Sequence, residues 1–159
     1  MTAQAIAFVE ANPACFERSL AEGHITGSAW IASPDEQRVV LIHHRKLDRW
    51  FQPGGHADGD PDVAAVALRE AREETGLTDL TLVSPAIFDV DVHVIPTRGD
   101  VEAHLHYDIR FRLKSDEKII TGENREVTAI RWLKLAEAEA LAGSQSVGRM
   151  IRKSRNLNQ

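Results

Sequence analysis

Hydrophobic and polar positions alternate along several stretches of the chain, which is the pattern of a half-buried β-strand. Strand-forming residues fill positions 24–31 and 38–43, and Ser33-Pro34-Asp35-Glu36 between them is typical of a turn. We expect these two strands to be joined by that turn. Further extended stretches are expected at residues 50–52, 80–95, 104–113 and 127–133.

Helix signals are clearest at residues 60–76. Asp60 can cap the helix, Pro61 suits its first position, and Gly76 suits its exit. The pattern around Asn12 and Pro13 predicts a helix stop followed by a capped restart, so that residues 1–22 form a helical arm. Residues 136–159 are expected to form a C-terminal helix and a basic, polar tail.

The order of these elements predicts an α/β fold with a mixed sheet flanked by helices, because helices and strands do not alternate regularly. With 159 residues the chain has the usual size of one compact domain, so we expect a single domain over residues 1–159. Its apolar fraction of 43% and charged fraction of 27% argue against disorder.

The charge and cysteine content narrow the range of partners. The net charge is −5 and the basic residues are dispersed, so no nucleic-acid or anionic membrane partner is predicted. The single cysteine, Cys15, excludes an intrachain disulfide. No secretory signal or membrane-spanning run is visible, and we expect a cytoplasmic protein.

Carboxylates are concentrated in the second half of the predicted central helix. On a helical wheel Glu70 and Glu74 continue the apolar stripe of Val63 and Ala67, and Glu73 lies at its edge. Like charges at this spacing repel one another, and partial burial adds a desolvation cost. A divalent cation would remove both costs, because Mg²⁺ prefers oxygen ligands. The flexible Gly54-Gly55 loop before the helix could add a carbonyl oxygen, for which Gly54 is the candidate.

From Gly55 to Leu77 the chain reads GHADGDPDVAAVALREAREETGL, which resembles the Nudix box, Gly-x5-Glu-x7-Arg-Glu-U-x-Glu-Glu-x-Gly-U, with U aliphatic. The match covers about a seventh of the chain and is long and fixed in spacing. The positions in register are Gly55, Arg69, Glu70, Ala71, Glu73, Glu74, Gly76 and Leu77. One position departs from the motif, because Pro61 replaces its first Glu.

The resemblance implies a Nudix-type α/β/α sandwich and a pyrophosphohydrolase that cleaves the diphosphate linkage of a small-molecule nucleoside diphosphate derivative. It implies Mg²⁺ as cofactor, with Mn²⁺ as a substitute. Glu70 and Glu74 are the preferred metal ligands, Glu73 is a third ligand or positions water, and Arg69 orients Glu73. In several Nudix enzymes a Glu from a later loop also assists, for which Glu123 and Glu126 are both candidates. A homodimer is common for this fold.

A second ionisable pattern lies on two later strands. Asp89, Asp91 and His93 alternate with valines, and His104, His106 and Asp108 alternate with apolar residues. If the two strands pair with His93 opposite His104 and Asp91 opposite His106, these groups form one patch. It is either a hydrated sheet face or a site for substrate phosphate or a second metal.

We expect His104 and His106 to contact substrate, and His56 beside the glycine loop is a weaker candidate of the same kind. Trp50 could stack on a base, although an aromatic residue there is more often part of the core. Residues 43–46, His-His-Arg-Lys, could form a cationic rim.

Three other functions stay open. A non-catalytic Nudix-like module that senses a nucleotide would have the same fold, although the intact helix acids favour hydrolysis. An isoprenoid-type diphosphate isomerase would need a cysteine near the site, which the position of Cys15 disfavours. A zinc or iron protein built on the histidines is the third alternative.

Overall fold

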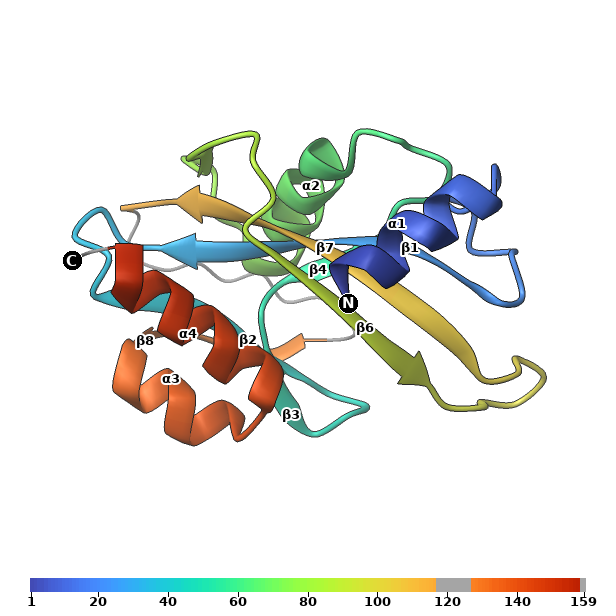
Figure 1. The fold of residues 1–159 in the computed structure, drawn as a ribbon. Helices are drawn as coiled ribbons and strands as arrows, with labels where there is room; N and C mark the ends of the chain where they lie inside the picture. Colours follow the sequence, from blue (N-terminus) through green and yellow to red (C-terminus); the bar gives the residue numbers. More distant parts are fainter. Residues whose placement is uncertain (117–126, 158–159) are drawn as a thin grey trace.

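The computed structural model describes residues 1–116 and 127–157. Within these ranges the elements in chain order are α1 (Thr2–Ala11), β1 (Gly23–Ala32), β2 (Arg38–His44), β3 (Arg49–Phe51), β4 (Gly54–His56), α2 (Val63–Thr75), β5 (Thr81–Leu82), β6 (Asp89–Ile95), β7 (His104–Lys114), β8 (Val127–Lys134), α3 (Leu135–Ala142) and α4 (Gln145–Leu157). The described strands form one mixed sheet (Figure 1).

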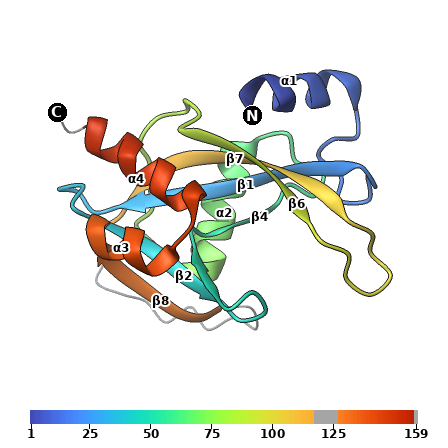
Figure 2. The same cartoon turned by 60° about the horizontal axis from the view of Figure 1, so that its bottom comes forward.

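Helices cover both faces of this sheet, which confirms the predicted α/β class (Figures 1 and 2). Helix α2 packs Ala67 and Ala71 against one face, together with Ile31 of β1. Helix α4 packs Met150 and Ile151 against the other face, in a cluster with α3. Burial of apolar side chains on both sides of the sheet is the main stabilising contribution of such a layered fold.

Strand β1 is the centre of the sheet and is buried along its whole length. It pairs in parallel with β7, from Gly23 opposite Leu105 to Ala32 opposite Lys114, and antiparallel with β2 and β4. The predicted turn between β1 and β2 is confirmed. The partnership of β1 with β7 joins segments that are about 80 residues apart, as in a crossover connection.

The predicted register between β6 and β7 is wrong by two residues. His93 lies opposite His106 and Asp91 lies opposite Asp108, because pairing begins at Ile95 and His104 at the end of the hairpin. The Arg98–Val101 bridge closes the connection between these strands. A shift of two residues keeps each side chain on its own face, so the ionisable face survives the correction.

The cap and the first residue of helix α2 both lie two positions later than predicted. Asp62 is the N-cap, and its carboxylate accepts a hydrogen bond of 3.1 Å from the Ala65 amide, so Pro61 lies before the helix. Asp60 accepts from the Asp62 amide at 2.9 Å and stabilises the approach instead. Gly76 ends the helix in the left-handed conformation, with φ of 71°, as its position predicted.

Three other expected segments differ from the structure. Residues 80–95 hold only the short β5 and β6 as strands, because Ser84-Pro85 forms a turn in which the Ser84 hydroxyl accepts from the Ala86 amide. The helical restart after Asn12 is absent, and residues 13–22 form turns. The C-terminal segment forms two helices rather than one, because Gly143 adopts a left-handed conformation between them.

No helix in the described ranges is both long enough and apolar enough to cross a bilayer.

Candidate active site

The glycine loop and the acidic half of α2 lie in close contact. A Cβ atom at position 55 would overlap the Glu70 carboxylate, so glycine is required for this approach. The amide of Gly54 donates a hydrogen bond of 2.9 Å to Oε2 of Glu74, which is buried. Strand β4 holds the loop in place by pairing with β1, with Gly54 opposite Ser28. The structure therefore brings Gly54, Glu70 and Glu74 together, as predicted.

Arg69 has a different partner from the one expected. Its Nη2 donates to the His56 carbonyl at 3.2 Å and to Oε1 of Glu70 at 3.3 Å, and Nη1 lies 3.9 Å from Asp60. The arginine thus connects the loop to Glu70 rather than orienting Glu73. Glu73 lies on the exposed part of α2, at the edge of the stripe that the wheel predicted.

The pKa of Glu70 reflects the repulsion and the desolvation that the sequence predicted for the helix carboxylates. Burial raises the pKa of Glu70, and the charge of Glu73 raises it further, while Arg69 opposes both effects. The available donors are carboxylate and backbone oxygens, which is the chemistry that a hard divalent cation prefers. A cradle that only glycine permits, with a carboxylate destabilised by burial, fits such a cation.

Three histidines from three strands meet on the face of the sheet opposite α2. We call this set the histidine group, and its members are His24 of β1, His56 of β4 and His106 of β7. One ring nitrogen from each can be chosen so that all three lie within 4.8 Å of one another. The Nε2 atoms of His24 and His106 are 3.1 Å apart. His24 is buried, and its Nδ1 has no hydrogen-bond partner among residues 1–116 and 127–157.

Two members of the histidine group, His24 and His106, are held in the neutral state. Burial lowers the pKa of His106 to about 2, and the neighbouring histidines His56, His24, His93 and His104 lower it further. Burial likewise lowers the pKa of His24 to about 4. Imidazolium binding to phosphate, one of the predicted uses of these residues, therefore does not suit His24 or His106 at neutral pH.

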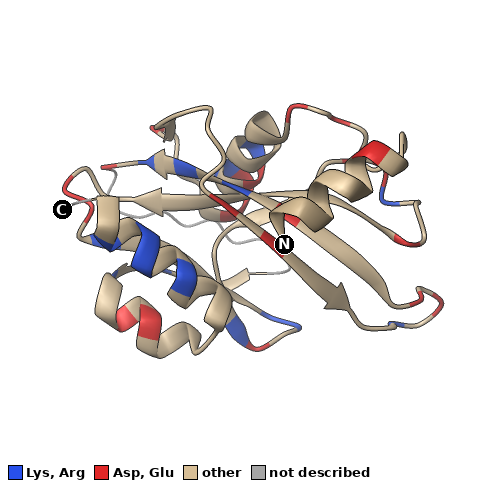
Figure 3. Ribbon diagram, in the orientation of Figure 1, with Lys and Arg blue, Asp and Glu red and all other residues tan. Residues whose placement is uncertain are grey.

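The polar face of β6 and β7 has the histidines at one end and an ion-pair network at the other. We call Asp89, Asp91 and Asp108 the aspartate end; the cations around it are Arg110, Arg149 and Lys153. Arg110 is buried and contacts all three carboxylates, and α4 supplies the other two cations (Figure 3). Side-chain hydrogen bonds, led by that from His93, hold the pKa of Asp91 well below its usual range. These acids are already paired and fasten α4 to the sheet.

The model of the NUDIX domain family matches residues 24–153, which include the glycine loop, helix α2, the histidine group and the aspartate end. The chain belongs to the NUDIX domain family.

Similar proteins agree with this membership. A CMP-5'-(N-acetyl-N-hydroxy-3-aminopropyl)phosphonate hydrolase of Streptomyces rubellomurinus is 30% identical over 125 residues, which are 74% of this chain and 56% of that protein. The chain thus spans about half the length of this curated relative. The structure of a C. elegans Ap4A hydrolase binary complex has a TM-score of 0.61 and 18% identity, and covers 84% of this chain and 96% of its own. The MutT protein of Methanosarcina mazei Go1 has a TM-score of 0.66 and 17% identity, with 88% and 98% coverage. These structural likenesses show the NUDIX fold.

The remaining predicted site residues lie in different parts of the fold. His104 lies beside the histidine group, with its ring centroid 5.0 Å from that of His24. Trp50 lies on β3, where its ring packs against His43 and Arg131, so its neighbours are those of a packed aromatic residue. Glu123 and Glu126, the two candidates for a later-loop base, lie outside the described residues.

Two functional features were not found by sequence reasoning. His24 was counted only as a strand residue, because the parallel pairing that brings it beside His106 leaves no local signal. Arg110 and Arg149 were also missed as partners of the aspartate end. The period-2 placement of Arg110 after Asp108 was an available signal.

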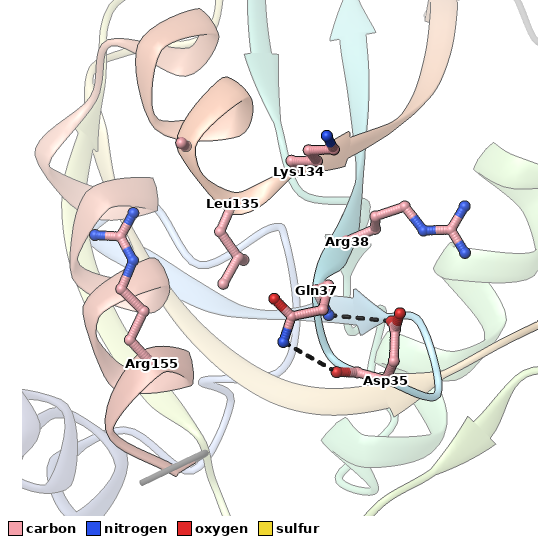
Figure 4. A pocket seen from close by; sticks show the side chains of 7 residues that line it. Asp35, Gln37, Arg38, Lys134, Leu135 and Arg155 are labelled. Carbon is pink, nitrogen blue, oxygen red and sulfur yellow. Dashed lines mark hydrogen bonds between the residues drawn. The ribbon is translucent and has the colours of Figure 1, made fainter.

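A pocket of about 820 Å³ lies on another part of this NUDIX domain. It lies between the β1–β2 turn and the start of α3, and its lining includes Gln37, Arg38, Leu135 and Arg155 (Figure 4). None of the predicted site residues lines it.

Proposed function

We propose that this protein is a pyrophosphohydrolase that cleaves the phosphoanhydride linkage of a nucleoside diphosphate derivative with the help of Mg²⁺. The observation that carries the proposal is the contact of the Gly54-Gly55 loop with Glu70 and Glu74. This arrangement gathers oxygen donors at the end of a rigid helix, where they suit a cation bound together with substrate phosphates.

The residues of the site have separable roles in this proposal. Glu70, Glu73 and Glu74, with the Gly54 carbonyl, would hold the cation, which supplies charge neutralisation and activation of water. The hydrogen bond from the Gly54 amide fixes the Glu74 carboxylate. Arg69 fixes the Glu70 carboxylate relative to the loop. Glu73 is exposed and can therefore position a solvent molecule. Water adds to phosphorus, the bridging P–O bond breaks, and a base on the enzyme takes the proton.

The substrate class is supported by chemistry and by likeness. The Streptomyces relative is named for a CMP-linked phosphonate and the C. elegans neighbour for Ap4A, so nucleotide compounds are the first class to test. His56, His104 and His106 are not included in the substrate site, because their rings lie on the face of the sheet opposite Glu70 and Glu74. Trp50 is not included, because His43 and Arg131 pack against its ring. We also propose that the enzyme acts in the cytoplasm as a homodimer.

The test is phosphate or nucleotide release from a panel of nucleoside diphosphate derivatives with Mg²⁺, comparing the wild type with Glu74→Gln. This substitution keeps the shape of the side chain and removes its charge. We expect kcat to fall by about 10²-fold to 10³-fold, as for loss of one strong electrostatic contribution to a transition state. Exchanging Mg²⁺ for Mn²⁺ should preserve turnover in the wild type.

The matched control is Glu139→Gln on α3, since Glu139 forms an exposed ion pair with Arg155. It should keep wild-type turnover. Equal activity of Glu74→Gln and Glu139→Gln would refute the role of the helix acids, and no turnover on any compound would favour a nucleotide-binding module without catalysis.

A further inference from the structure

The histidine group has the geometry of a nitrogen-donor metal site. Its members come from β1, β4 and β7, so their backbone positions are set by sheet hydrogen bonds rather than by a flexible loop. Two zinc–nitrogen bonds of about 2.0–2.1 Å at a tetrahedral angle place the nitrogens roughly 3.3 Å apart. The Nε2 atoms of His24 and His106 are 3.1 Å apart. One ring nitrogen of each of the three histidines can be chosen so that all three lie within 4.8 Å of one another. A closer approach of these nitrogens would complete a three-nitrogen set.

The chemistry of neutral imidazoles also favours a metal over an anion. Acidic residues of the same face lie at the aspartate end, where Arg110, Arg149 and Lys153 neutralise them. His93 is the nearest link between the two ends: its Nδ1 lies 3.1 Å from Asp91, and its ring centroid is 5.6 Å from that of His106. His104 also adjoins the group, with its Nδ1 2.9 Å from the Glu102 carbonyl. Neutral imidazoles present lone pairs, and lone pairs bind cations.

We propose that His24, His56 and His106 form a binding site for a divalent transition metal, with Zn²⁺ as the fitting ion. Three imidazole nitrogens suit zinc far better than magnesium, which prefers oxygen donors. The fourth position of a tetrahedral ion stays open for water or another oxygen ligand.

This site is chemically separate from the carboxylate site on α2, although the chain connects them. His56 supplies its ring to the histidine group and its carbonyl to Arg69, which in turn contacts Glu70. Strand side chains alternate between faces, so the adjacent Gly55 is directed toward Glu70 while the His56 ring lies on the opposite face. The zinc site therefore stands whether or not the helix acids are catalytic.

The experiment is titration of the metal-free full chain with Zn²⁺ alone and, as a spectroscopic probe, with Co²⁺ alone. We expect one equivalent to bind and Co²⁺ to give the visible absorption of a four-coordinate site. His56→Gln and His106→Gln should each weaken Zn²⁺ binding by at least roughly 10-fold to 100-fold, because even partners that merely orient metal ligands have effects of that size. Bound Zn²⁺ should also raise the Tm of the wild type.

Two control variants define the site. His43→Gln removes a histidine that contacts Thr128 and Trp50 elsewhere in the fold, and Glu74→Gln removes a helix acid. Both should retain wild-type Zn²⁺ affinity. Circular dichroism establishes that each variant is folded.

Weak Zn²⁺ binding that is the same in the wild type and in His56→Gln would overturn the proposal. So would loss of the bound equivalent in Glu74→Gln, which would assign the metal to the carboxylates. If the histidine variants do not fold, NMR of the imidazole nitrogens in the wild type decides: unchanged signals from the histidine group on addition of Zn²⁺ would also overturn it.

Discussion

The two ends of the polar face differ in how the fold treats their charges. At the aspartate end the carboxylates of Asp89 and Asp108 are almost completely buried, and Arg110 lies between them. Burial alone would raise the pKa of Asp89, but hydrogen bonds from Arg149 and Lys153 hold it below its usual range. At the histidine end His24 and His106 are also taken from water, but their neighbours are other histidines, so both lose their charge. The same strands and the same alternation therefore produce a salt-bridged anchor at one end and a neutral set of lone pairs at the other.

This difference distinguishes polar side chains that stabilise the fold from polar side chains that can bind a ligand. A buried carboxylate with hydrogen-bonded cations has its interactions satisfied within the protein. Asp108, for example, accepts from Thr26 and Ser28 as well as from Arg110. The neutral imidazoles of His24 and His106 carry lone pairs, which an external cation can use. A stripe of ionisable residues in a sequence is therefore not necessarily one site. The part of the stripe that is paired with counterions stabilises the fold, and the part that is not can bind a ligand.

The largest expected effect is on the aspartate end. Arg110→Met keeps much of the side-chain volume but leaves buried carboxylates without their central cation. We expect a loss of about 3–5 kcal/mol in the free energy of unfolding, measured by urea denaturation, as for removal of one partner of a buried ion pair.

Its control is the double variant Arg110→Met/Asp108→Asn, which also removes one of the buried carboxylate charges that lost its cation. It should recover part of the lost stability. If Arg110→Met is as stable as the wild type, the network does not anchor the sheet as described.

A smaller effect for each side chain is expected from acid at the histidine end, over the range down to pH 4. Below the ordinary histidine pKa of about 6.5 the unfolded chain binds a proton at His24, while the folded protein does so only below a pKa of about 4. Stability is therefore lost as the pH falls from 6.5 toward 4, by about 3 kcal/mol for His24, and His106 contributes in the same direction down to its pKa of about 2.

Urea denaturation from pH 7 to pH 4, with a chelator present, measures this loss. His24→Gln should show a flatter pH dependence in that window. Asp89 and Asp91 have depressed carboxyl pKa values, so the stabilisation that they contribute is lost only at lower pH, below the ordinary aspartate pKa of about 3.9. Identical pH profiles for the wild type and His24→Gln would argue against a neutral, buried histidine.

The smallest effect is expected where charges stay in water. Arg155 and Glu139 form a pair of 3.1 Å, but their side chains are 44% and 40% exposed. Arg155→Gln should therefore change the free energy of unfolding by about 1 kcal/mol or less. A loss comparable to that of Arg110→Met, by the same denaturation measurement, would mean that burial is not what distinguishes the two pairs.

Local signals in the sequence were sufficient for much of the fold and for the carboxylate site. Gly76 predicted the end of α2 because a left-handed residue is needed there, and the stripe of Glu70 and Glu74 predicted their burial. The start of α2 was misplaced because Asp60 and Asp62 are both good caps, and only the hydrogen bond to Ala65 distinguishes them. The β6–β7 register failed for a similar reason, since alternation fixes the face of a strand but not its offset.

The sequence by itself determined the family motif, the acidic face of α2 and the alternation that puts histidines and aspartates on one face of the sheet. Each of these depends on neighbours within one or two turns of helix or a few residues of strand. Only the tertiary structure decided that His24 lies beside His106, and that Arg149 reaches Asp89 from α4. Those contacts join segments more than 50 residues apart, and such pairings are set by packing of the whole sheet rather than by any local pattern.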